Sequence, residues 1–141
     1  MKPPTTVAGQ RGAMMLEALI GILIFSTGIL ALIGMQALAI AYAADAKYRA
    51  DASFLANQVI ADMWVHRGTL SSYEYTGSGS PPAPIATWVT SVEKALPGAA
   101  SNRPIIDVEG ELVTVTVRWR PPNSEAVRNH KTLALISNAS S

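Results

Sequence analysis

The chain has 141 residues, a formal net charge of +1 and no cysteine. This length allows one domain with a small core, and the lack of cysteine excludes disulfide bonds, thiolate zinc sites and cysteine nucleophiles. No block of like charges is present, so the sequence indicates neither an acidic tail nor a basic nucleic-acid-binding tail.

Residues 1–12 form a short leader whose charges are Lys2 and Arg11. An uncharged run of 27 residues, Ala18 to Ala44, follows shortly after it. As a helix this run would extend roughly 40 Å, which exceeds the ~30 Å hydrocarbon thickness of a bilayer. A secretory signal would place a shorter apolar region before a small-residue cleavage site, and here the order is reversed. The basic leader predicts an inner-membrane span with its N-terminus in the cytoplasm and the rest exported.

Glu17 places a carboxylate directly before the uncharged run that begins at Ala18. An unpaired charge at the centre of a membrane costs about 2.5–3.5 kcal/mol on insertion scales, so this side chain needs a partner or a polar surrounding. One hypothesis is pairing with a cation. The alternative is a juxtamembrane side chain that lies among lipid headgroups.

The stretch Gly12-Ala13-Met14-Met15-Leu16-Glu17, after a basic leader, resembles the class III signal of type IV prepilins and pseudopilins. The resemblance implies that a prepilin peptidase cuts between Gly12 and Ala13 and N-methylates Ala13. It also implies that Glu17, the fifth mature residue, meets the new N-terminal amine of its own or a neighbouring subunit. The i,i+4 spacing places Ala13 and Glu17 one helical turn apart. Major pilins usually carry Phe where this chain has Ala13, which favours a minor subunit.

Three glycines, Gly21, Gly28 and Gly34, recur six or seven residues apart in the apolar run. We expect them within about one broad face of the helix. Small residues let helices approach closely in membranes, which predicts a packing surface for other subunits. The alternative is that these glycines are tolerated in a lipid-embedded helix without a partner.

Beyond Ala44 the sequence becomes amphipathic without a helix breaker, so the helix is predicted to continue to Arg67 with Gly68 as a left-handed cap. The apolar residues with i, i+3, i+4 spacing are Ala52, Leu55, Ala56, Val59, Ile60, Met63 and Trp64. Residues 69–84 are rich in Ser, Gly, Tyr and Pro, which predicts a loop. A flexible connector is favoured over a recognition loop.

The last third of the chain predicts a short helix and three strands. The helix covers 87–96, with Trp88, Val89, Val92 and Leu96 on one face, and the strands cover 105–108, 112–120 and 131–136. The expected fold class is therefore α+β. The pilin resemblance implies the same fold: a long N-terminal helix, transmembrane in its first half, with a small antiparallel sheet packed on its second half. The expected parts are leader 1–12, stem 13–44 and head 45–141, and the head more loosely resembles minor pilins of the PilV type.

Other chemistry has little support in the sequence. The histidines, His66 and His130, lack the spacing of a metal site, and no nucleophile motif is present, so no metal, cofactor or catalytic activity is expected. A candidate basic patch consists of Arg118, Arg120, Arg128 and Lys131. Nucleic-acid binding by this patch is less favoured than a solvated, edge-protecting strand face. The tryptophans Trp64, Trp88 and Trp119 are expected in the head core.

The expected function is that of a minor type IV pilin, in adhesion or motility. The resemblance implies processing by prepilin peptidase at the inner membrane, then incorporation into the pilus at the cell surface through the helices of other minor and major pilins. Two alternatives remain. One is a minor pseudopilin of a type II secretion system, and the other is a signal-anchored periplasmic module that binds DNA or another ligand.

Overall fold

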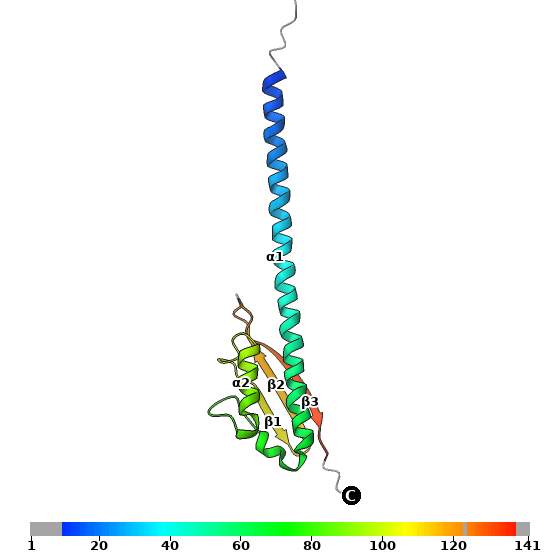
Figure 1. The fold of residues 1–141 in the computed structure, drawn as a ribbon, viewed down its shortest axis with the longest axis vertical. Coiled ribbons are helices and arrows are strands. Elements are labelled where there is room, and N and C mark those ends of the chain that lie inside the picture. Colours follow the sequence, from blue (N-terminus) through cyan, green and yellow to red (C-terminus); the bar gives the residue numbers. More distant parts are fainter. Residues whose placement is uncertain (1–9, 123, 138–141) are drawn as a thin grey trace, which may run out of the picture. The chain divides into compact units, whose positions relative to one another are not determined.

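The computed structural model describes residues 10–122 and 124–137. In chain order these form α1 (Gln10–Val65), the 3-10 helices η1 (Arg67–Tyr73) and η2 (Ala83–Ile85), α2 (Ala86–Ala95), β1 (Ile105–Glu109), β2 (Leu112–Trp119) and β3 (Arg128–Leu135) (Figure 1). The fold is α+β, which confirms the predicted class. The chain divides into two compact units between Ala43 and Ala44. The second unit, which begins at Ala44, is called the head from here on.

In the first unit, the structure describes the N-terminal part of α1. An 18-residue window of this helix has a mean hydropathy of 2.4, and none of the window is buried. By length and composition α1 could cross a membrane. Its large apolar side chains, from Met14 to Tyr42, are exposed. Hydroxyls within the apolar run bond inside the helix, as Ser26 Oγ does by donating to the carbonyl oxygen of Ile22 at 2.7 Å.

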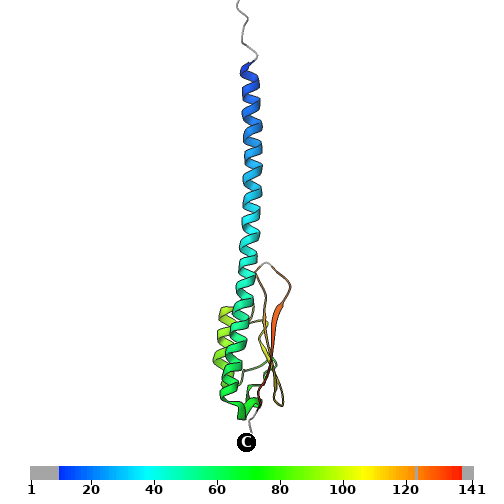
Figure 2. The ribbon, with the colours of Figure 1, turned by 90° about the vertical axis from the view of Figure 1, so that its right-hand side faces the viewer.

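The head has two layers, in which the C-terminal part of α1 and α2 cover one face of the sheet (Figure 2). The sheet is antiparallel and three-stranded, with the order β1-β2-β3. Alternate residues of β2 are buried beneath the helices, namely Val113, Val115, Val117 and Trp119. This alternation confirms the strand predicted from the Val-Thr-Val pattern. The third strand begins three residues earlier than predicted, at Arg128, because Arg128 and His130 pair with Trp119 and Val117.

The core of the head confirms most of the predicted helix faces. Buried residues of α1 are Ala52, Leu55, Ala56, Val59, Ile60 and Met63, and the predicted face of α2 is buried as well. Trp88 and Trp119 lie in the core as expected, whereas the prediction for Trp64 is wrong, because 44% of it is exposed. Met63 is fully buried, and the next residue of a helix points about 100° away from it.

The predicted end of the long helix is also wrong in detail. The helix ends at Val65, and Gly68 lies inside η1. Gly68 is not among the described glycines with positive φ, which are Gly77, Gly79, Gly98 and Gly110. The chain therefore has no left-handed cap at Gly68. Instead the backbone N–H of Thr69 donates to the carbonyl oxygen of His66 at 2.9 Å, which continues the chain in a tighter helix.

Residues 69–84 are more structured than the predicted flexible connector. Leu70, Tyr73 and Tyr75 are buried, and the backbones of Tyr75 and Ile106 exchange hydrogen bonds of 2.9 and 2.8 Å. Arg103 Nη1 also donates to the carbonyl oxygen of Gly79 at 2.9 Å. The segment is polar on average, but a few well-spaced apolar side chains are enough to attach it to the core.

Candidate functional site

The predicted processing site lies at the beginning of α1. The Gly12–Ala13 bond is in the first turn of the helix, and Gly12, Ala13 and Glu17 are all exposed. The structure therefore brings Ala13 and Glu17 onto one face, about 40° apart around the helix axis. In the uncut chain the nitrogen of Ala13 is a neutral amide, so a charged pair with Glu17 requires cleavage first. Lys2 and the rest of the leader up to residue 9 lie outside the described residues.

The predicted packing glycines need a correction. In an unbroken α-helix with about 100° per residue, Gly34 lies roughly 120° from Gly28, so the three glycines do not share one face. Glu17, Gly21 and Gly28 do share a face, within an arc of about 40°. Gly21 and Gly28 are seven residues apart, which is close to two helical turns, whereas Gly28 and Gly34 are only six apart. This shorter spacing places Gly34 on a different face of the helix.

The face formed by Glu17, Gly21 and Gly28 has room for a neighbour. A Cβ atom added at either glycine would meet no atom within 4 Å. The glycines are therefore not required by packing inside the described part of the chain. Because small residues lower the distance of closest approach, this face suits a second helix in a membrane or in a bundle of apolar helices.

Two of the four residues in the candidate basic patch, Arg118 and Arg128, make contacts with other residues of the head. Arg118 donates from Nε and Nη2 to the carbonyl oxygen of Arg103, at 2.9 and 2.6 Å. Arg128 Nη1 forms an ion pair of 2.8 Å with Asp45 Oδ2. These two arginines thus make contacts within the head, and both keep their positive charge.

A polar cluster that the sequence analysis missed joins the end of α1 to η1. The Tyr73 hydroxyl donates to Asp62 Oδ2 at 2.7 Å, and His66 Nδ1 lies 3.0 Å from the same hydroxyl oxygen. Burial, followed by the hydrogen bond to Asp62, raises the pKa of Tyr73 to about 12. The i,i+4 spacing of Asp62 and His66 was visible in the sequence, but the contact with Tyr73 depends on the path of η1. Within residues 10–122 and 124–137, no three His, Cys, Asp or Glu residues converge as metal ligands.

The Tyr73 hydrogen bond predicts a loss of stability at alkaline pH. Its pKa is raised in the fold from 10.0 to about 12, so the stabilisation is present below pH 10 and is lost as the pH rises towards 12. Tyr73→Phe should lower the free energy of unfolding by about 1 kcal/mol at neutral pH and flatten its decline above pH 10. Urea denaturation of the detergent-solubilised chain at about pH 9 and about pH 11.5 measures both effects.

Tyr42→Phe is the matched control, because Tyr42 is exposed on α1 and should leave the alkaline decline unchanged. An equal decline in the Tyr73→Phe variant and the unsubstituted chain would contradict the assignment.

Comparison of the chain with protein-family models, with curated proteins and with solved structures gives no match. The arrangement of a long apolar N-terminal helix followed by a small antiparallel sheet is compatible with a pilin-like fold.

Proposed function

We propose that the chain is a minor type IV pilin that is cleaved between Gly12 and Ala13 and assembles through α1. The observation that carries the proposal is the position of Glu17. Its carboxylate is exposed on an apolar helix, one turn after the Gly12–Ala13 bond, and no hydrogen bond or ion pair occupies it among the described residues. An apolar surrounding makes such a carboxylate costly until a cation reaches it.

Cleavage supplies that cation. Hydrolysis of the Gly12–Ala13 bond leaves a carboxylate on Gly12 and an amine on Ala13, which is protonated at neutral pH and stays basic after N-methylation. The helical spacing brings this amine near Glu17 of the same chain, and an adjacent subunit offers the same group. Pairing offsets the desolvation of both charges, so assembly is favoured only after processing.

The face of Glu17, Gly21 and Gly28 then acts as the contact for a neighbouring helix. The glycines allow close approach, and the carboxylate sets the axial position of the partner's amine. Before assembly α1 lies in the inner membrane with its N-terminus in the cytoplasm, and the head is outside. After assembly the subunit is part of the pilus, with other minor and major pilins as its partners.

N-terminal sequencing tests the proposal. The full chain is extracted from membranes of cells with and without prepilin peptidase. With the enzyme, the expected first residue is N-methylated Ala13, and without it the expected first residue is Met1. An intact Met1 in cells with active peptidase would contradict the proposal. Recovery of the processed chain in sheared pili separates a pilus subunit from a pseudopilin of a type II secretion system.

A further inference from the structure

A groove of about 440 Å³ lies in the head between α1 and α2, beside η2. This volume is within the range of about 300–1,000 Å³ that is usual for small-ligand sites. The groove is independent of the N-terminal part of α1, so what it binds does not depend on the proposed pilin function.

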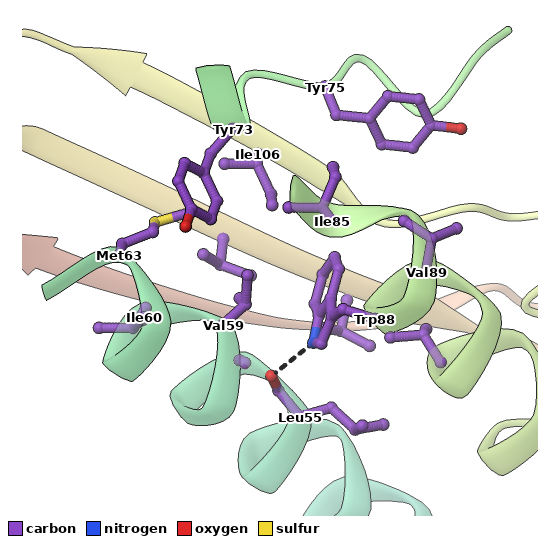
Figure 3. Close-up of a cluster of buried hydrophobic side chains, with 14 of the residues drawn as sticks. Leu55, Val59, Ile60, Met63, Tyr73, Tyr75, Ile85, Trp88, Val89 and Ile106 are labelled. Atoms are coloured by element: carbon purple, nitrogen blue, oxygen red, sulfur yellow. Dashed lines mark hydrogen bonds between the residues drawn. The ribbon is translucent and has the colours of Figure 1, made fainter. Parts of the chain in front are cut away.

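The floor of the groove is apolar. Val59 and Trp88 line it, and only 3% and 8% of these residues are exposed. The indole Nε1–H of Trp88 donates to the carbonyl oxygen of Leu55 at 2.8 Å, which uses its one polar atom (Figure 3). The floor therefore offers a ligand van der Waals contact and no hydrogen bond.

Two pairs of polar side chains, one pair from α1 and one from α2, also line the groove and form its walls. Gln58 and Asp62 are one turn apart on α1, and Thr87 and Ser91 are one turn apart on α2. The Ser91 hydroxyl donates to the carbonyl oxygen of Thr87 at 3.0 Å, so its hydrogen is used and its oxygen remains able to accept a hydrogen bond.

Asp62 is the charged side chain of the groove lining. Its Oδ2 is held by the Tyr73 hydroxyl, which orients the carboxylate. Its Oδ1 lies 3.5 Å from His66 Nδ1, which is long for a hydrogen bond and leaves this oxygen able to accept a shorter one. An oriented carboxylate with neighbouring acceptors, above an apolar floor, is complementary to a cation carried on a hydrocarbon stem.

We propose that this groove binds the protonated amine of a lysine side chain presented by a partner protein. The ammonium group donates to Asp62 and to hydroxyl acceptors such as Ser91, and the methylene stem lies on Val59 and Trp88. Anionic ligands are disfavoured by the charge of Asp62. A neutral sugar donates hydroxyl hydrogen bonds to a carboxylate but brings no opposite charge to Asp62.

The test is a titration of the full-length, 15N-labelled chain in detergent micelles with Nα-acetyl-lysine methylamide, followed by NMR. A saturable shift of the Trp88 indole signal is expected. The Trp119 indole, which is buried in the core outside the groove, should not move. Asp62→Asn should weaken binding about tenfold or more, because a hydrogen bond to a charged group is lost. The Nζ-acetylated ligand, which has no charge, should not bind.

Two variants serve as controls. Asparagine at position 62 still accepts the Tyr73 hydroxyl, so Asp62→Asn should keep the dispersed spectrum of the folded head. Asp107→Asn removes an exposed carboxylate on β1, outside the groove, and should leave the affinity unchanged. Should Asp62→Asn not fold, Ser91→Ala keeps the charge and should weaken binding severalfold.

Three results would overturn the inference: no saturable shift of Trp88, equal binding of the charged and the Nζ-acetylated ligand, or equal affinity of folded Asp62→Asn and the unsubstituted chain. A saturable shift with N-acetylglucosamine but none with the lysine derivative would identify a sugar site instead, and would also overturn it.

Discussion

Gly12→Val is expected to leave the chain uncut, so that Met1 remains the first residue and the subunit is absent from pili. The Gly12–Ala13 bond lies in the first turn of α1. We expect this turn to unwind before a peptidase reaches the carbonyl group of Gly12. Glycine lowers the cost of leaving the helix by about 1 kcal/mol relative to alanine, and it allows close approach of another backbone. A β-branched side chain obstructs that approach. N-terminal sequencing of membrane-extracted protein measures the result.

Gly21→Val is the matched control for processing. It makes the same substitution nine residues further along α1, at another position where an added Cβ meets no atom. This variant should be cut normally, although its packing face is altered. Normal cleavage of Gly12→Val would show that the proposed scissile bond is wrong.

Glu17→Gln should be inserted and cleaved normally, yet its incorporation into sheared pili should fall by about tenfold or more. Glutamine keeps the size and helix propensity of glutamate but removes its charge, so the amine of Ala13 has no ionic partner in the apolar surrounding. An unpaired charge costs several kcal/mol, and each 1.4 kcal/mol corresponds to about a tenfold change in an equilibrium constant. Quantitative immunoblotting of membranes and sheared pili measures the two fractions.

Glu74→Gln is the control for the loss of one negative charge, because Glu74 is exposed in the head. It should be incorporated normally. If Glu17→Gln also reached the sheared pili at the level of the unsubstituted chain, the pairing role of Glu17 would be refuted. The processing role of Gly12 would stand, since the two substitutions affect separate steps.

The helices and strands of this protein are largely predictable from the sequence, because each depends on residues that are close together in the chain. Apolar length predicts α1, and the i,i+4 spacing predicts the shared face of Ala13 and Glu17. Alternation predicts β2, and the apolar face of Trp88, Val89 and Val92 predicts α2. Each pattern repeats within a few residues, so local physics is enough to predict the elements and the α+β class.

The tertiary structure decided the features that depend on distant residues. Trp88 bonds to Leu55 across 33 positions, and Arg128 pairs with Asp45 across 83. The 3-10 helix η1 places Tyr73 beside Asp62, and the packing of α2 on α1 forms the groove. The periodic patterns that predict helices and strands do not predict these contacts. Each contact forms only when the whole head packs and its apolar faces are removed from water. The sequence by itself therefore determined the apolar helix and the strand pattern, and the packing decided which polar groups meet.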